Sequence, residues 1–204
     1  MKKLLLLLAV LISLSSLAYT QTAEDYYNQG VDSYKLGNYN DAIGLYTKAI
    51  DLNPNYANAY INRGNSYNDL KEYNNALTDL NKAIEINPDI AEAYYNRGIV
   101  FAVGLKEYSK GISDYTKAIE INPNNAKIYY NRGLAYGQGL QDYPKAISDF
   151  TKSIEINPEI AEAYNNRGLA YHFSGNTNKA CEEWQKAYTL GLEIAKNLMD
   201  KYCK

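Results

Sequence analysis

Apolar and small residues recur along the chain at the spacing of amphipathic α-helices. Between residues 57 and 88 they form two stripes, separated by a break near Lys71. The first stripe, with members three, four or seven residues apart, consists of Ala59, Tyr60, Arg63, Gly64 and Tyr67. The second stripe consists of Ala76, Leu80 and Ala83. Since proline cannot continue the hydrogen-bond ladder of a helix, Pro88 ends the second stripe, and the pattern predicts two consecutive helices.

The same pair of stripes repeats through most of the chain. An Asn-Pro dipeptide recurs at steps of 34, 35 and 35 residues, and an Asn-x-Gly tripeptide recurs in phase with it. The dipeptides begin at Asn53, Asn87, Asn122 and Asn157, and the tripeptides begin at Asn28, Asn62, Asn96, Asn131 and Asn166. Aligned on both markers, the chain divides into the units 23–56, 57–90, 91–125, 126–160 and 161–194.

Each unit places small residues where its two helices must approach closely, and a large ring opposite them. In the first unit the small residues are Gly30, Ala42 and Ala49, and the ring is Tyr46. The units 91–125 and 126–160 each carry one extra residue, near Gly104 and Gly139 respectively. We expect this residue in the turn between the two helices, where an insertion disturbs packing least.

This order of small, large and small residues followed by proline resembles the tetratricopeptide repeat, and the resemblance covers nearly all of the chain after residue 20. The units depart from the family in having Tyr where it often has Trp, and Arg where it often has Leu. The resemblance implies an all-α fold for residues 21–204, a single domain built as a right-handed solenoid of antiparallel helix pairs. It also implies a non-catalytic protein–protein interaction module that binds a protein or peptide and needs no cofactor.

Tyrosine is unusually abundant, with 22 residues against three Phe and one Trp. Nine of these tyrosines occupy two repeated positions, and we interpret both sets as packing rings whose hydroxyl groups reach the wet edge. The first set is Tyr26, Tyr60, Tyr94, Tyr129 and Tyr164, and the second, in the turns, is Tyr39, Tyr73, Tyr108 and Tyr143.

Arginine and an acidic residue occur together in four units and are absent together from the first. The pairs, 16 or 17 residues apart, are Arg63 with Asp79, Arg97 with Asp114, Arg132 with Asp149 and Arg167 with Glu183. The first unit has Gln29 and Leu45 in those places. This joint presence and absence predicts an ion pair across each helix hairpin. The alternative is a row of arginines that binds an anionic ligand.

The first 20 residues are typical of a secretory signal peptide. Lys2 and Lys3 precede an apolar run over 4–12, which is too short to span a ~30 Å hydrocarbon core comfortably. Cleavage after Ala18 or after Thr20 would leave a protein with no membrane span, exported to the periplasm or the outside of a bacterial envelope. The alternative is an uncleaved N-terminal anchor.

The composition disfavours most other classes of function. The full chain has 21 basic and 23 acidic residues, and removal of residues 1–20 leaves a net charge of −4, so a polycationic nucleic-acid-binding protein is excluded. With one His and two Cys, one copy of the chain cannot assemble a multi-ligand zinc or haem site of the usual kind, so we expect no metal. An enzyme would have to use His172 near Glu162 or Glu183, or carboxylates alone.

The Asn of each Asn-x-Gly tripeptide is the main candidate for ligand binding. By the family resemblance, first helices line the concave face, and Asn28, Asn62, Asn96, Asn131 and Asn166 point from it. An Asn amide offers donors and an acceptor that match a peptide bond, as in the similar Asn ladder of O-GlcNAc transferase, which holds extended polypeptide by its backbone. Tyr95 and Tyr130 lie beside the ladder, as do Tyr27 and Ile61, and Leu134 and Leu169 would add apolar contacts. The alternative is that each Asn bonds between neighbouring units.

The carboxylate clamp of the family, which binds chaperone tails, fits the chain poorly. Asn65, Asn96 and Lys127 occupy matching places, but Ile61 and Asn131 stand where Lys and Arg are needed. Without those two cations a terminal carboxylate would be held weakly. We therefore expect Asn65 and Lys127 to contribute to the groove without forming this clamp.

The last residues predict a capping helix over 192–203, with Leu192, Ala195, Leu198, Met199 and Tyr202 on one face. Cys181 and Cys203 lie about equally far on either side of Gly191. If the cap is antiparallel to the preceding helix, the two thiols can form a disulfide, which export to an oxidising compartment would permit. The alternative for Cys181 is a small buried apolar residue.

Taken together, the sequence predicts an exported scaffold or adaptor that binds an extended polypeptide segment in its concave groove, as a monomer or with weak self-association. The alternatives are a self-associating structural protein of the cell envelope and an accessory subunit of an enzyme. Sedimentation at tens of micromolar would separate the first alternative from a monomeric adaptor.

Overall fold

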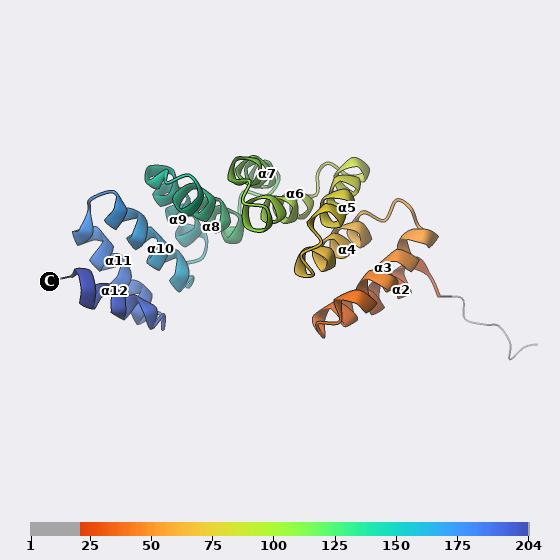
Figure 1. Cartoon of the computed structure of the whole chain (residues 1–204), viewed down its shortest axis with the longest axis horizontal. Helices are drawn as coiled ribbons and strands as arrows, with labels where there is room; N and C mark the ends of the chain where they lie inside the picture. The colour runs from red at the N-terminus through yellow and green to blue at the C-terminus, as the bar shows by residue number, and fades with distance from the viewer. Residues whose placement is uncertain (1–20, 204) are drawn as a thin grey trace, which may run out of the picture.

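The computed structural model describes residues 21–203, and in this range the chain folds into helices without strands. Consecutive helices form antiparallel pairs that follow one another along a curved path, and a single helix closes the C-terminal end (Figure 1). The first helices are α2 (Ala23–Lys35), α4 (Ala57–Asp69), α6 (Ala91–Ile99), α8 (Ala126–Leu134) and α10 (Ala161–Phe173). Their partners are α3 (Tyr39–Leu52), α5 (Tyr73–Ile86), α7 (Tyr108–Ile121), α9 (Tyr143–Ile156) and α11 (Thr177–Thr189). The closing helix is α12 (Ile194–Tyr202), and the architecture is the expected α-helical solenoid.

The two helices of each pair approach closely because a Gly in the first faces a large side chain in the second. A Cβ atom added to Gly98 would lie 2.7 Å from the Tyr115 ring, and one added to Gly168 would lie 2.6 Å from Nε1 of Trp184. The equivalent contacts join Gly30 to Tyr46, Gly64 to Leu80 and Gly133 to Phe150. Each of the five large side chains is buried. The prediction of small residues opposite a large ring is thus confirmed, with Leu80 as the aliphatic member.

The Asn-Pro dipeptides end the second helices by making turns. In each case the Asn side chain accepts a hydrogen bond from the backbone N–H two residues later, which forms an Asx turn. The Oδ1 atom of Asn87, for example, accepts from Asp89 N at 3.0 Å. The other three bonds join Asn53 to Asn55, Asn122 to Asn124 and Asn157 to Glu159. Asn and Pro together therefore stop each helix and turn the chain into the next pair.

The extra residue of the third and fourth units lies in a different place from the one expected. It is absorbed at the ends of the first helices, as the π-helical segments η1 (Val100–Gly104) and η2 (Ala135–Gly139). The wider turns are closed by bonds from Leu105 N to Val100 O at 2.9 Å and from Leu140 N to Ala135 O at 3.2 Å. The turns themselves keep their conformation, with a positive φ at Lys106 as at Lys71 of the unit without an insertion. Widening the helix preserves the turn, which is why the insertion is not in it.

The π-helical segments leave room for a single methyl group at the contact between the paired helices. In the third unit Ala102 faces Gly111, whose added Cβ would lie 2.6 Å from that of Ala102 and 2.9 Å from the carbonyl oxygen of Gly98. In the fourth unit the sizes are exchanged, with Gly137 facing Ala146.

We therefore expect Gly111→Ala to lower the free energy of unfolding by about 1–3 kcal/mol through overpacking. Adding Ala102→Gly recreates the arrangement of the fourth unit and is expected to recover most of the loss, measured by urea unfolding. Gly44→Ala is the matched control, because Gly44 is an exposed Gly in α3 with open space around it, and should raise stability by about 0.5–1 kcal/mol. Additive effects of the two changes at 102 and 111 would contradict this account.

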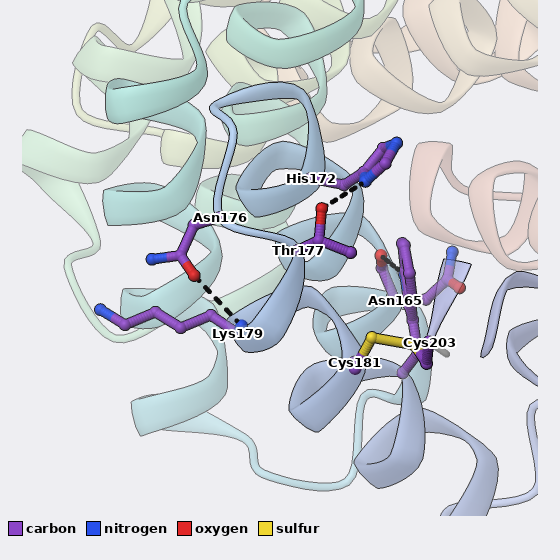
Figure 2. Close-up of a disulfide and its surroundings, with 8 residues drawn as sticks. Asn165, His172, Asn176, Thr177, Lys179, Cys181 and Cys203 are labelled. Atoms are coloured by element: carbon purple, nitrogen blue, oxygen red, sulfur yellow. Dashed lines mark hydrogen bonds between the residues drawn. A yellow bond between two sulfur atoms is a disulfide. The ribbon is translucent and has the colours of Figure 1, made fainter.

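The helix α12 covers the apolar end of the last pair, as expected. Ala195 is fully buried against α11, and Leu198, Met199 and Tyr202 pack on the same cluster. The predicted disulfide is present, joining Cys181 of α11 to Cys203 with a Cα–Cα distance of 5.8 Å (Figure 2). The C-terminal cap is thus held both by packing and by a covalent bond.

The predicted signal peptide, residues 1–20, lies outside the described residues. The helix α2 begins just after it with a capping box, in which Thr22 and Asp25 bond each other's backbone N–H groups. Cleavage after Ala18 or Thr20 would leave this cap intact. Within residues 21–203, the helices are too short or too polar to cross a bilayer.

Candidate functional site: a groove on the first helices

Hydrogen bonds between Tyr and Asn join the first helices of neighbouring pairs. Asn131 Nδ2 donates to the Tyr95 hydroxyl at 2.8 Å, which links α8 to α6. The equivalent bonds run from Asn62 to Tyr27 at 3.0 Å and from Asn166 to Tyr130 at 3.0 Å. The alternative interpretation of the Asn ladder, bonding between units, thus describes these three residues. Each bond leaves the Asn Oδ1 atom as an acceptor and the Tyr hydroxyl hydrogen as a donor.

The Tyr–Asn series is interrupted between the second and third units. Ile61 stands where the first, third and fourth units have Tyr27, Tyr95 and Tyr130. Its side chain is only 1% exposed, packed in a core cluster with Ala93 and Val100. The expectation that Ile61 lines the groove is therefore wrong, because an aliphatic side chain gains more from burial at this place than from facing water. As a consequence Asn96 Nδ2 is buried without a hydrogen-bond partner.

A groove lies over the first helices of the third, fourth and fifth units. Its volume is about 890 Å³, and we call it the Tyr–Asn groove. Tyr95, Tyr130 and Asn131 line its wall, and Lys127 and Glu162 place one positive and one negative charge beside it. The loops 122–125 and 156–160, between units, form its rim. Four of the predicted site residues, Tyr95, Lys127, Tyr130 and Asn131, therefore lie around one cavity.

The remaining predicted residues do not line this cavity. Asn28 is exposed on α2, and Asn62 and Asn65 are half-buried on α4. Asn96 is half-buried on α6, and Asn166 on α10 lines a second, smaller cavity. The sequence did not reveal this cluster, because which loops border the groove depends on how whole units stack.

The four arginines are used in ion pairs, as predicted from their joint occurrence with acids. Arg132 Nε and Nη2 donate to the two carboxylate oxygens of Asp149, both at 2.8 Å. The same pairing joins Arg63 to Asp79 and Arg97 to Asp114. In the fifth unit Arg167 Nη2 alone donates to both carboxylate oxygens of Glu183. Hydrogen bonds to Asp114 raise the pKa of Arg97. The arginines are thus neutralised in place, which argues against a row of cations for an anionic ligand.

A third contact of each arginine was missed in the sequence. Arg132 Nη1 donates to Thr116 Oγ1 at 3.0 Å, in the second helix of the preceding pair. Thr47 and Thr151 take the same role for Arg63 and Arg167, and Asn81 takes it for Arg97. The guanidinium also lies over the ring of the Tyr three residues earlier, at 5.5–5.7 Å from the ring centroid. Each arginine therefore joins two consecutive units, and the first described unit has Gln29 at the equivalent place.

The single imidazole sits in an aromatic cluster at the C-terminal cap. His172 Nδ1 lies 3.2 Å from Thr177 Oγ1 (Figure 2). The His172 ring is 4.3 Å from that of Tyr202. Glu183, proposed as its catalytic partner in the enzyme alternative, is bonded by Arg167 instead. Among the residues that the structure describes, no three His, Cys, Asp or Glu side chains are placed to hold a metal ion.

Several tyrosine hydroxyls are held away from water, with a consequence for alkaline stability. Burial raises the pKa of Tyr115, and burial likewise raises the pKa of Tyr95, against the opposing effect of the bond from Asn131. A pKa above the ordinary value of about 10 means that the folded protein keeps protons which the unfolded chain loses. The contribution of these tyrosines to the free energy of unfolding is therefore fully present below about pH 10. Above that pH it declines, by up to about 1.4 kcal/mol per pH unit for each such tyrosine.

We expect Tyr115→Phe to make this decline less steep, measured by guanidinium unfolding between pH 8 and 11. The hydroxyl of Tyr115 is buried without a partner, and Phe150 fills the equivalent place of the fourth unit, so the variant should fold and should not be destabilised at pH 8. An unchanged slope above pH 10 would show that Tyr115 does not titrate with unfolding.

Comparisons with known proteins agree with this architecture. The family profile described as TPR repeat matches residues 32–70, 64–104 and 105–139, and profiles described as Tetratricopeptide repeat match 126–160 and 150–182. No curated protein sequence matches the chain significantly.

Solved structures with similar folds include MamA, with 30% sequence identity and a TM-score of 0.72 over 82% of this chain and 96% of that one. YrrB, described as a TPR protein with an unusual peptide-binding site, has 25% identity and a TM-score of 0.71 over 87% of this chain and 92% of that one. MamA from Desulfovibrio magneticus RS-1 has 22% identity and a TM-score of 0.75, over 85% and 97% of the two chains, which shows a shared fold. Because the first profile alone spans more than half of the sequence and the helices form the same solenoid, the chain belongs to the tetratricopeptide repeat family.

Proposed function

We propose that the protein is an adaptor that binds an extended polypeptide segment in the Tyr–Asn groove. The observation that carries this proposal is the convergence of Tyr95, Lys127, Tyr130 and Asn131 around one cavity of about 890 Å³. Each Tyr–Asn pair offers one O–H donor and one amide oxygen acceptor, which match the C=O and N–H groups of a peptide backbone. The description of YrrB as having a peptide-binding site supports the same class of ligand.

Because the Asn side chains form hydrogen bonds between units, substituting them affects the stability of the fold as well as the binding of a peptide. Since Asn131 and Asn166 donate to Tyr hydroxyls, their replacement by Ala should lower stability as well as binding, by about 0.5–1.5 kcal/mol for each lost bond. A test of binding therefore needs a residue without a structural role. Lys127 is such a residue, because it is exposed on the first turn of α8 and lines the groove.

The test begins with peptides selected from a random dodecamer library against the purified protein. The affinity of a selected peptide, measured by fluorescence anisotropy, should fall several-fold in Lys127→Ala and should be unchanged in Lys196→Ala, an exposed Lys on α12. Failure to select any peptide, or equal affinities of the two variants, would refute binding in this groove.

We also propose that the protein is exported. The basic and apolar pattern of residues 1–20 supports a cleaved signal peptide, and the Cys181–Cys203 disulfide is the kind of bond that persists in an oxidising compartment. Mass spectrometry of the protein produced in a secreting host should give a chain beginning at Tyr19 or Gln21. An intact N-terminus beginning at Met1 would refute cleavage.

A further inference from the structure

A second cavity, of about 300 Å³, lies between the fourth and fifth units near the turns within the pairs. We call it the Phe173 pocket, and its apolar lining includes Leu134, Phe150, Leu169, Ala170 and Phe173. The Phe173 side chain, which lines it, is 62% exposed, whereas Phe101, Phe150 and Trp184 are half-buried or buried. A pocket of this size and character is suited to an apolar group.

The pocket lies at the one junction in the described chain where a unit with a π-helical segment is followed by a unit without one. At the two preceding junctions the Tyr that begins the second helix lies against a Gly of the next π-helical segment, so that Tyr73 covers Gly104 and Tyr108 covers Gly139. The fifth unit has no π-helical segment, and Tyr143 instead stacks on the Phe173 ring, with centroids 5.6 Å apart and planes inclined by 20°. Gly137, without a side chain, lies on the other side of the space.

The Phe173 pocket and the Tyr–Asn groove meet at one hydrogen-bonded pair. Tyr130 lines the groove, Asn166 lines the pocket, and Asn166 donates to the Tyr130 hydroxyl. From Lys127 to Gly137 the fourth unit's first helix advances about 15 Å, at 1.5 Å per residue. An extended polypeptide covers this length with about five residues.

We propose that the Phe173 pocket receives one large apolar side chain of the polypeptide segment that occupies the Tyr–Asn groove. This inference rests on the proposed function and adds to it a direction and a specificity. The segment runs along the first helix of the fourth unit, beside that of the fifth, and its apolar residue lies about five positions from the residue beside Lys127. The polar groove binds the backbone of many sequences, and the pocket selects among them by a single side chain.

The test uses a fluorescent peptide selected from the random dodecamer library, and the same peptide with its shared large apolar residue changed to Ala. Phe173→Ala should weaken the first peptide by about tenfold or more, the effect of removing much of the contact with a buried apolar side chain. It should leave the Ala-substituted peptide unchanged, because that peptide has nothing to place in the pocket. Leu36→Ala is the matched control, since Leu36 is 77% exposed at the other end of the solenoid.

The outcomes separate this inference from the proposed function. If selected peptides bind and depend on Lys127 but are equally sensitive to Phe173→Ala with and without their apolar residue, the pocket assignment is wrong and the groove assignment stands. If no peptide is selected, both are wrong. Because Phe173 is mostly exposed, the variant should keep the helical circular dichroism of the wild type, and a loss of binding can be attributed to the pocket.

Discussion

Arg132→Ala is expected to lower the free energy of unfolding by about 3–5 kcal/mol, the largest effect of any single substitution proposed for this protein. The side chain of Asp149 is only 7% exposed, so removal of the guanidinium leaves a buried carboxylate that is neither solvated by bulk water nor paired with a cation. The same change removes the bond to Thr116 and the contact with the Tyr129 ring. Urea unfolding followed by circular dichroism measures the loss.

A double-mutant cycle with Asp149→Ala tests whether the loss arises from the pair. The double variant should be less destabilised than the sum of the two single variants, because it leaves no uncompensated charge. Gln29→Ala, at the equivalent place of the first unit, should change stability by at most about 0.5 kcal/mol. If the changes in the free energy of unfolding caused by Arg132→Ala and Asp149→Ala simply add, the loss does not arise from the ion pair.

The consequences of Arg132→Ala should be local, because units of a solenoid contact only their neighbours. Arg132 joins α8 to α9 in its own unit and to α7 in the preceding one. Hydrogen exchange is therefore expected to accelerate first in the third and fourth units. A uniform acceleration over all units would indicate a fully cooperative solenoid instead.

The parts of the fold that the sequence predicted are those in which two residue types vary together. Gly and a large side chain recur in register, and packing density leaves few other ways to place them, so the helix pairs followed from the repeat. Arg and acid are present or absent together, which pointed to their contact. Cys181 and Cys203 lie on either side of a turn, and their bond could be proposed from that symmetry.

The parts that could not be predicted depend on which neighbour a side chain meets. The repeat period shows that the third unit has one residue more than the second. The alignment of the units does not show whether this residue lies in the turn or in a π-helical segment, because either can accommodate it. The decisive signal is weak, a small residue, Ala102 or Gly137, where other units have Tyr34, Asn68 or His172. Similarly, Asn131 and Tyr95 are 36 residues apart, and the sequence gives the face of each helix without giving their contact.

The sequence indicated a groove on the first helices, but it did not indicate that the cavity lies at the third, fourth and fifth units. The Asn positions indicated the face of the first helices that carries the groove. In the structure, however, Ile61 is buried in the core, and three Asn Nδ2 groups are hydrogen-bonded to Tyr hydroxyls. What distinguishes the third to fifth units is the set of loops around them, together with Lys127 and Glu162. Because loop positions relative to a neighbouring unit are set by the stacking of whole pairs, single-unit patterns do not reveal them.

Reduction of the Cys181–Cys203 bond is expected to cost about 3 kcal/mol of stability and to release the cap before the rest of the protein. The bond closes a loop with a sequence separation of 22 residues, which limits the freedom of the unfolded chain. The helix α12 has nine residues, too few to be stable in water without its contacts. When the bond is absent, those contacts alone must hold it.

The fluorescence of the single Trp can report the release of α12. This residue, Trp184, is fully buried in α11, and lies 5.8 Å from the Tyr202 ring of α12 between ring centroids. Its Nε1 donates to the carbonyl oxygen of Asn165. Release of α12 should expose the indole to water and shift its fluorescence emission to longer wavelength.

Cys203→Ser should therefore lower the first thermal transition, detected by Trp184 fluorescence, more than the main transition detected by circular dichroism. A reductant should have the same effect on the wild type and no further effect on Cys203→Ser, which serves as the matched control. Thiol labelling of the untreated protein should find no reactive cysteine. Two reactive thiols, or equal melting curves of wild type and variant, would show that packing alone holds the cap.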